Sequence, residues 1–386
     1  RSFGDWSSDV CSSDLYALAA GESPIVPRHI YDGKGDPLQN PNNRAPVGTG
    51  PFVFKEWVLG NYVGYVRNPN YWDSPKPYLD ALLVRVIPDG AARAVAFETG
   101  ELDLGGSTPV SPLDLERFRS LPHLGQETRG YEYSPTLYGL EFNLDHPILK
   151  SPQVRKAIAH AVDPAVVLNV AWYGLGERTV SIVSPTLKRF YNDKVPTYPY
   201  DPKAAARLLD EAGFPLRGRW RFALTHDFQP FGENFKRSGE ALKSALAAVG
   251  IDVTVRGQDF PSYLKRVYTD RDYDFTFHPF TNMFDPTVGL QRFFTSDNYR
   301  KGVAFTNASH YSNPEVDQLF AQIAVESDTT RRRALIDRFQ EVVADELPVL
   351  PLMLSKPVTV YNRKVIGHTV DSAGVQGNFA GVWLRG

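Results

Sequence analysis

Helical and strand-forming segments alternate along this chain from residue 150 to about residue 350. The first helix is the clearest, because Ser151 is a good N-cap and Pro152 takes the favoured first helical position. An apolar stripe at helical spacing follows, at Val154, Ala157, Ile158, Ala161 and Val162. Such alternation is typical of an α/β domain built around its own sheet. The sequence therefore predicts an α/β fold for this part of the chain.

The segments on either side of this region are rich in strands, glycine and proline. The simplest topology inserts one domain into another: residues 16–140 form a first lobe, 141–350 a second α/β lobe, and 351–386 return to the first. The chain then crosses twice, near Tyr138–Asn143 and Leu347–Leu354. Two lobes joined by two crossing strands form a hinge, and the space between them is the default ligand cleft.

Composition excludes several function classes. The 42 Lys and Arg residues are balanced by 44 Asp and Glu residues, so no basic excess exists for nucleic acid. The only cysteine, Cys11, excludes an internal disulfide and a cysteine-based zinc site. No run approaches the 18 or so apolar residues of a membrane span. We therefore expect no nucleic-acid partner.

The opening stretch RSFGDWSSDVCSSDL has neither helical nor strand periodicity and repeats Ser-Ser-Asp. It resembles translated adaptor sequence, so we interpret residues 1–15 as non-native and exclude them from the fold. On this interpretation the native N-terminus, with any export signal, lies outside the chain. A plain disordered tail is the alternative.

Motifs of catalysis are missing from the sequence. It contains no GxSxG, HExxH, Walker A or dinucleotide-binding run. The eight histidines are scattered, and no carboxylate spacing singles out an acid–base pair. We therefore predict no enzyme activity, no catalytic residues, no metal site and no cofactor.

Four groups of short motifs follow one another along the chain. They are PVGTGPF at 46–52 with NPNYW at 68–72 and PYLD at 77–80; FETGELD at 97–103; FN at 142–143 with VRKAI at 154–158 and AVD at 161–163; and YDP at 200–202 with AAARLL at 204–209 and EAGF at 211–214. Their order and spacing resemble the bacterial extracellular solute-binding proteins of family 5, the peptide, nickel and opine receptors of ABC importers. The similarity runs from about residue 24 to the end.

The resemblance implies a two-lobe periplasmic-binding-protein-like fold of class II type, with mixed sheets and a hinge of two crossing strands. Family members are longer, so we expect the first lobe to be incomplete and the chain to be N-terminally truncated. The implied function is capture of a peptide-like or other small polar solute outside the cytoplasmic membrane. A monomer would deliver it to ABC permease subunits.

The most informative segment for ligand binding is YDFTFHPFTNMFDPTVGLQRFFTSDN at 273–298. We predict a buried strand ending at Phe277 and a loop, His278–Asp285, facing the cleft. In peptide-binding relatives, an Asp three residues before an Asp-Pro pair receives the ligand's amino group. Asp285-Pro286 matches the pair, but the earlier position is Asn282. A neutral amide cannot form that charge-assisted bond, which favours an opine, a sugar-like solute or a modified peptide.

The other candidate ligand contacts each have a structural alternative. Arg292 could bind a ligand carboxylate or hold Asp285 within the second lobe. Asp285 is also a natural turn or cap residue, Asn282 a natural turn residue, and His278 a natural buried histidine. Aromatic contacts are predicted at Phe280, Phe284 and Tyr138, where core packing is the alternative.

Two rival functions remain open from the sequence. A hydrolase on the same two-lobe scaffold would need a nucleophile–base pair or perturbed carboxylates in the cleft. A signalling receptor would bind its solute in the same way and present it to a sensor. Permease and ATPase genes beside its own would distinguish import from signalling.

Overall fold

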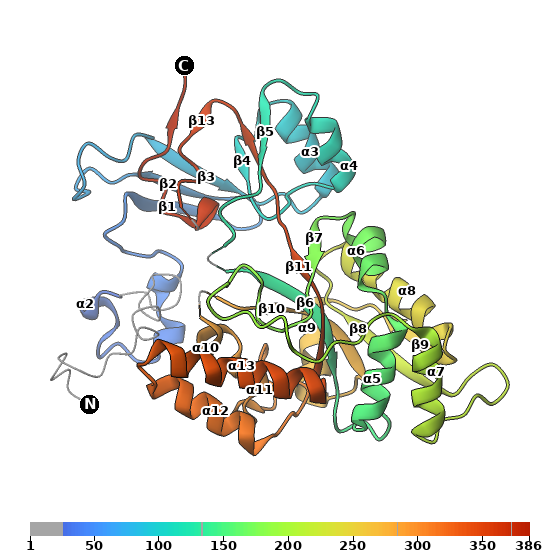
Figure 1. Ribbon diagram of the computed structural model, residues 1–386. Coiled ribbons are helices and arrows are strands. Elements are labelled where there is room, and N and C mark those ends of the chain that lie inside the picture. The colour runs from blue at the N-terminus through green and yellow to red at the C-terminus, as the bar shows by residue number, and fades with distance from the viewer. Residues whose placement is uncertain (1–25, 133, 284, 372) are drawn as a thin grey trace. The chain divides into compact units, whose positions relative to one another are not determined.

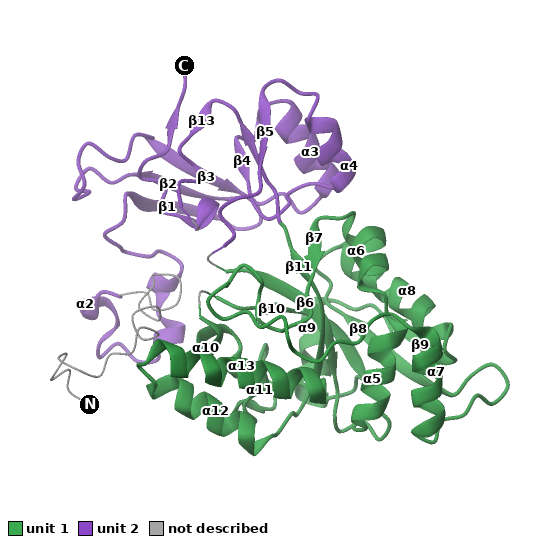
Figure 2. Cartoon of the chain, viewed as in Figure 1, with its two compact units in different colours: residues 1–17, 134–356 green, residues 18–133, 357–386 purple. Residues whose placement is uncertain are grey.

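The computed structural model describes residues 26–386, except residues 133, 284 and 372 (Figure 1). The described chain divides into two compact units (Figure 2). Unit 1 holds residues 134–356, and unit 2 holds residues 26–132 and 357–386. The segment 1–15 lies outside the described residues. The unit boundaries therefore fall just before and just after the expected crossings.

Unit 1 is built from alternating helices and strands. Its strands are β6 (Thr136–Phe142), β7 (Gly176–Arg178), β8 (Phe222–Phe228), β9 (Ile251–Arg256), β10 (Phe275–Thr281) and β11 (Val349–Ser355). Its helices are α5 (Pro152–Ala161), α6 (Pro164–Trp172), α7 (Pro202–Glu211), α8 (Glu233–Ala247), α9 (Phe260–Leu264), the π-helical η3 (Lys265–Asp270), α10 (Pro286–Gly289), α11 (Gln291–Phe294), the short η4 (Ser296–Asn298), α12 (Pro314–Val325) and α13 (Thr329–Glu346).

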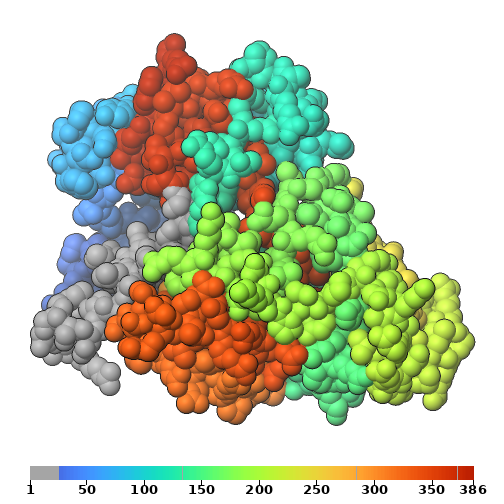
Figure 3. All heavy atoms as spheres, in the orientation of Figure 1, coloured from blue at the N-terminus to red at the C-terminus, as the bar shows by residue number. Residues whose placement is uncertain are grey.

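The strands of unit 1 form one six-stranded sheet in the order β7-β11-β6-β10-β8-β9. Strands β10, β8 and β9 are parallel, whereas β6 is antiparallel to both of its neighbours. The sheet is therefore mixed, as the family resemblance implies. Residues of α5–α8 pack on one of its faces, and residues of α11–α13 contribute to the cluster on the other. Helices α12 and α13 pack side by side, and Figure 3 shows them in orange on the surface.

The described part of unit 2 contains three smaller sheets. The first is β1 (Phe52–Val58), β2 (Tyr62–Arg67) and β3 (Ala81–Arg85); the second is β4 (Leu104–Gly105), β12 (Thr359–Asn362) and β5 (Leu124–Glu127); the third is β13 (Val365–Ile366) with β14 (Trp383–Leu384). Its helices are α2 (Arg28–Tyr31), α3 (Gly90–Glu98) and α4 (Pro112–Phe118), with short 3-10 turns η1 (Pro37–Gln39), η2 (Pro41–Asn43) and η5 (Gly374–Gln376). Strand β12 brings the C-terminal segment into the second sheet.

The predicted end of the strand at Phe277 is wrong, because β10 continues to Thr281. Its extension pairs with β6, where His278 lies opposite Gly139. Strand β8 ends opposite Phe277, so the extension has a partner on one side only. A proline is tolerated at such an edge, which explains how Pro279 fits within the strand.

Candidate functional site

Three parallel strands of unit 1 end at the same edge of its sheet. The segments that follow β8, β9 and β10 include residues 229–231, 257–260, 282–283 and 285, which we call the carboxyl rim. Thr136, where the chain enters β6, pairs with Thr281 at this edge. In open α/β sheets, ligands bind beyond the carboxyl ends of the strands. The carboxyl rim is therefore the candidate binding site within unit 1.

Each of the three strands is followed by an amide side chain. Gln229 comes directly after β8, Gln258 two residues after β9, and Asn282 directly after β10. Gln258 donates from Nε2 to Asp227 Oδ1 at 3.0 Å. Its carbonyl oxygen Oε1 is buried and has no hydrogen-bond partner among the described residues. A buried acceptor without a donor is costly, so this oxygen is suited to a donor on a ligand.

A row of aromatic rings adjoins the carboxyl rim. The rings of Phe231 and Phe260 lie 4.9 Å apart, and Phe305 stacks on Phe260 at 6.3 Å with an interplanar angle of 26°. Phe231 is 55% exposed, and the other two rings are partly buried. Phe305 has a φ of 59°, a left-handed conformation that is rare for a bulky residue. Such strain is often found at functional sites.

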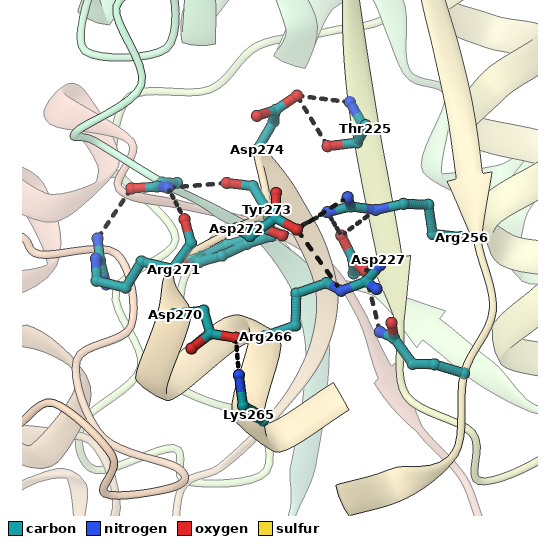
Figure 4. A network of polar contacts seen from close by, with 12 residues as sticks. Thr225, Asp227, Arg256, Lys265, Arg266, Asp270, Arg271, Asp272, Tyr273 and Asp274 are labelled. Atoms are coloured by element: carbon teal, nitrogen blue, oxygen red, sulfur yellow. Dashed lines mark hydrogen bonds and ion pairs between the residues drawn. The ribbon is translucent and has the colours of Figure 1, made fainter. Parts of the chain in front are cut away.

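Polar side chains beneath the rim are paired with one another. Figure 4 shows Arg256 of β9 and Arg266 of η3 converging on Asp227 of β8. Arg256 donates to Asp227 Oδ2 from Nη2 at 2.7 Å, and Arg266 donates to Oδ1 from Nη1 at 3.4 Å. Asp272 accepts a further bond from Arg256 at 3.4 Å. The network thus contains two positive and two negative side chains, and it fixes the ends of β8 and β9.

Asn282 lies at the rim, and both polar atoms of its side-chain amide are hydrogen-bonded inside unit 1. Its Oδ1 accepts a hydrogen bond from the backbone N–H of Ser184, and its Nδ2 donates to the carbonyl of Ile182 at 3.1 Å. The side chain is completely buried. Asn282 therefore holds the loop that follows β7, and a ligand contact stays a prediction.

Asp285 is also held internally. It caps α10 through the Thr287 N–H at 2.9 Å and forms a two-pronged ion pair with Arg332 at 2.9 and 3.0 Å. The sequence offered Arg292 as a possible holder of Asp285, but the structure gives this role to Arg332 of α13. The Arg292 guanidinium lies 4.9 Å from the ring of Phe293. Phe284 lies outside the described residues.

His278 and Phe280 lie inside β10 and are completely buried. His278 Nε2 is 2.9 Å from the Tyr268 hydroxyl, and both residues belong to an aromatic cluster with Phe293. Burial, helped by the nearby Arg292, lowers the pKa of His278 to about 3. The imidazole is therefore neutral at physiological pH. The structure does not place these two residues in the rim.

Tyr138 lies on the opposite face of the sheet from His278. Its ring packs against Trp172 at 4.4 Å and stacks on Phe277 at 5.5 Å. Burial raises the pKa of Tyr138 to about 12, so the phenol stays neutral. Tyr138 is thus part of the aromatic core beneath α6 and α8, and it does not join Asn282 and Asp285.

One buried carboxyl group of unit 1 stands out. Glu141 of β6 accepts a hydrogen bond from the Ser309 N–H at 2.9 Å, and its Oε2 has no partner among the described residues. Burial raises the pKa of Glu141 to about 8, although Arg271 acts in the opposite direction. On β8, burial lowers the pKa of His226 to about 4. Both groups are therefore held largely uncharged at neutral pH.

Sequence reasoning missed Gln258, Phe231 and Phe260 as candidate contacts. A signal was present: all three follow predicted strands that alternate with helices, and parallel strands end at one edge. Among the residues that the structure describes, no group of three or more His, Cys, Asp or Glu is suited to hold a metal ion. No helix in the same residues is both long and apolar enough to cross a membrane.

Comparison with known proteins identifies the family. The model for bacterial extracellular solute-binding proteins, family 5 Middle, matches residues 13–301. Heme-binding protein A of Haemophilus influenzae is 27% identical over 342 residues, 88% of this chain and 60% of that protein. Probable di/tripeptide-binding protein 5 of Pseudomonas aeruginosa is 28% identical over 337 residues, 86% of this chain and 61% of that protein. The chain thus spans about three fifths of the length of these relatives.

Solved structures agree with this assignment. The ABC transporter-associated periplasmic binding protein DppA from Helicobacter pylori, in complex with the peptide STSA, matches with a TM-score of 0.82 and 27% identity. The match covers 98% of this chain and 71% of that one. The mixed α/β fold is therefore the two-lobe fold of periplasmic binding proteins. The chain belongs to the bacterial extracellular solute-binding proteins of family 5.

Proposed function

We propose that this chain is the solute-binding part of an ABC importer that works outside the cytoplasmic membrane. The chain acts as a monomer. It captures a small, polar, peptide-like solute at the carboxyl rim and delivers this solute to permease subunits. One observation carries the location of the site. Two contacting rings, Phe231 and Phe260, and an amide oxygen of Gln258 without a hydrogen-bond partner among the described residues all lie in the segments that follow the parallel strands β8 and β9. Relatives named for binding heme and di/tripeptides support the function.

The rim is suited to holding a molecule without reacting with it. Phe231 and Phe260 present ring surface, which gives large contact area at low cost in conformational entropy. Gln258 Oε1 offers an acceptor for an N–H or O–H of the solute. Binding that favours one arrangement of the two lobes shifts their equilibrium, and the loaded form docks on the permease.

The environment of Asn282 narrows the class of solute. Its Oδ1, the one atom of the side chain that could accept a hydrogen bond from a charged amino group, already accepts from the Ser184 N–H, and its Nδ2 donates to Ile182. A solute without a free amino terminus at this position fits best. We therefore propose an opine, a sugar-like solute or an N-modified peptide.

A hydrolase on this scaffold is the weaker candidate, because the relatives named above are binding proteins. A signalling receptor uses the same binding step, so the gene neighbourhood separates it from import. Permease and ATPase genes adjacent to the gene support import.

The aromatic row gives the first test, by calorimetric titration of the intact gene product with the peptide STSA and its N-acetylated form. We expect tighter binding of the acetylated peptide. Phe231→Ala should weaken its binding about tenfold, because one exposed ring face is lost. Since the ring is 55% exposed, the free energy of unfolding should change by less than about 1 kcal/mol.

Tyr200→Ala is the matched control, since Tyr200 is a half-exposed aromatic residue outside the rim. It should leave the affinity unchanged. Equal effects of the two substitutions would remove the aromatic row from the site, and turnover of the peptides would support the hydrolase instead.

Asn282→Asp gives the second test. Because peptide-binding relatives carry an Asp at this position, the substitution is predicted to raise the affinity for amino-bearing solutes. The structure predicts that it also lowers the stability of the fold. The aspartate loses the donor to Ile182 and sets two oxygens against each other, so we expect a loss of about 1–3 kcal/mol in urea unfolding. The exposed Asn169→Asp carries the same chemical change as a control. Equal stability of both variants would show that the Asn282 amide does not hold the loop.

A further inference from the structure

A short stretch of unit 1, residues 305–309, joins the aromatic row to a deeply buried loop. Residues 307–309 belong to no helix or strand, yet Asn307, Ala308 and Ser309 are only 1–2% exposed. The backbone groups of a buried loop need hydrogen-bond partners just as those of a helix do. At the other end of the stretch, Phe305 stacks on Phe260 of the aromatic row. We call residues 305–309 the anchored segment.

Glu141 of β6 is one of the partners of this buried loop. Its Oε1 accepts a hydrogen bond from the Ser309 N–H at 2.9 Å. The Ala308 carbonyl accepts a hydrogen bond from the Tyr273 hydroxyl at 2.6 Å and another from Arg271. Both donors are labelled in Figure 4. Of these three partners, Glu141 is the acidic one, so its protonation state can change how firmly the loop is held.

Phe305 depends on such anchoring, because its own backbone conformation is unfavourable. Its φ of 59° lies in the left-handed region, which bulky residues rarely adopt. Such a conformation persists only where the surroundings hold it. The Phe305 ring lies 5.9 Å from the ring of Tyr268 and 6.1 Å from that of His278. These contacts orient the ring, whereas the hydrogen bonds at Ala308 and Ser309 hold the backbone that carries it.

We infer that Glu141 is a positioning residue for the solute site: through the anchored segment, it holds Phe305 against Phe260 in the aromatic row. This inference rests on the proposed function, because it takes the row to bind the solute. Glu141 lies opposite Thr276 near the start of β10, whereas the carboxyl rim begins after the end of that strand. A change at Glu141 therefore acts on the solute through Phe305.

The protonation of Glu141 gives this role a measurable signature. Burial raises the pKa of Glu141 to about 8, so the group is held largely neutral at pH 7. The ionisable side chains that face it are Arg271 and Tyr273 before β10, Tyr263 of α9 and Tyr268 of η3. Burial raises the pKa of each phenol further above its ordinary value, and Arg271 is paired with Asp145. Between pH 7 and pH 9 Glu141 is thus the group of this set that ionises, and a buried charge then loosens the anchored segment.

Calorimetric titration of the intact gene product with N-acetylated STSA at pH 7 and pH 9 tests the inference. This peptide has no group that titrates between the two values. The affinity of the unsubstituted protein should fall about fivefold at the higher pH, because the proton held by Glu141 is lost as the pH rises through 8. Glu141→Gln keeps the acceptor without the charge, so its affinity should be the same at both pH values. Glu141→Ala should bind about fivefold more weakly at both.

A second set of variants separates positioning from a general loss of stability. Phe305→Ala should weaken binding about fivefold, and the double variant with Glu141→Ala should bind no more weakly, because both changes act on the same ring. Arg221→Met is the control. Arg221 precedes β8, at the end of the strand away from the carboxyl rim, and donates to the carbonyls of Val249 and Phe214. Its loss should lower the urea midpoint and leave the affinity within twofold.

Hydrogen exchange on the solute-free proteins at pH 7 gives a readout that needs no solute. Amides of residues 305–309 should exchange at least tenfold faster in Glu141→Ala than in Glu141→Gln, and Arg221→Met should not accelerate them. Equal exchange in the two Glu141 variants, additive effects of Glu141→Ala and Phe305→Ala, or an affinity that stays constant from pH 7 to pH 9 would overturn the inference and leave the proposed function standing. Absence of binding by the unsubstituted protein would contradict the proposed function, and with it this role of Glu141.

Discussion

Arg332→Met should lower the free energy of unfolding by about 3–5 kcal/mol, the loss expected when one partner of a buried ion pair is removed. The side chains of Arg332 and Asp285 are 6% and 0% exposed, and two hydrogen bonds join them. Without the guanidinium, the carboxylate of Asp285 stays in the core, and among the described residues Thr287 is its remaining hydrogen-bond partner. Urea unfolding at neutral pH measures the loss.

Arg338→Met on the same helix is the matched control. Arg338 pairs with Glu315 at the surface, where the side chains are 51% and 47% exposed, so its loss should cost less than about 1 kcal/mol. The double variant Arg332→Met with Asp285→Asn should recover part of the loss, because the buried charge is gone and Asn still caps α10. Equal costs for Arg332→Met and Arg338→Met would show that the buried pair adds nothing.

Unfolding free energy should fall by about 2 kcal/mol between pH 6.5 and pH 8, and Glu141 should be the cause. The pKa of Glu141 is raised from 4.5 to about 8, so the folded state keeps a proton that the unfolded state has released. The stabilisation is complete below pH 4.5 and is lost as the pH rises through 8. Glu141→Gln keeps the acceptor for Ser309 and should flatten this part of the curve.

The buried histidines act in the opposite direction at lower pH. The pKa of His226 is lowered to about 4 and that of His278 to about 3. Their stabilisation is present above the unfolded-state pKa of about 6.5 and is lost as the pH falls toward these values. Between pH 6.5 and 8 the contribution of these histidines can only rise, so a fall in stability in this window points to Glu141. Glu240→Gln, at an exposed position of α8, should leave the fall unchanged. A fall of the same size in Glu141→Gln would assign it to another group.

Local signals in the sequence identify the elements of unit 1 well. The helix after Ser151 begins at Pro152, although the Ser151 side chain makes no capping bond. Asp201 and Asp285, each followed by proline, do cap their helices. These features depend on neighbouring residues only, so a single sequence contains them.

The candidate site was harder to predict because its contacts join distant residues. The side chain of Asn282 is hydrogen-bonded to the backbone at Ile182 and Ser184. Glu141 accepts a hydrogen bond from Ser309, which lies 168 residues further along the chain. The length of β10 depends on the point where β8 stops pairing with it. None of these partners has a local signature, so His278 and Phe280 read as loop residues although they lie in the core.

Amide hydrogen exchange on the intact gene product, with and without saturating N-acetylated STSA, tests the central claim most directly. Solute bound at the carboxyl rim should slow exchange at residues 229–231 and 257–260 and leave α12 and α13 unchanged. The peptide should be recovered intact. Protection confined to other parts of unit 1, or conversion of the peptide to product, would contradict a binding site where the three parallel strands end.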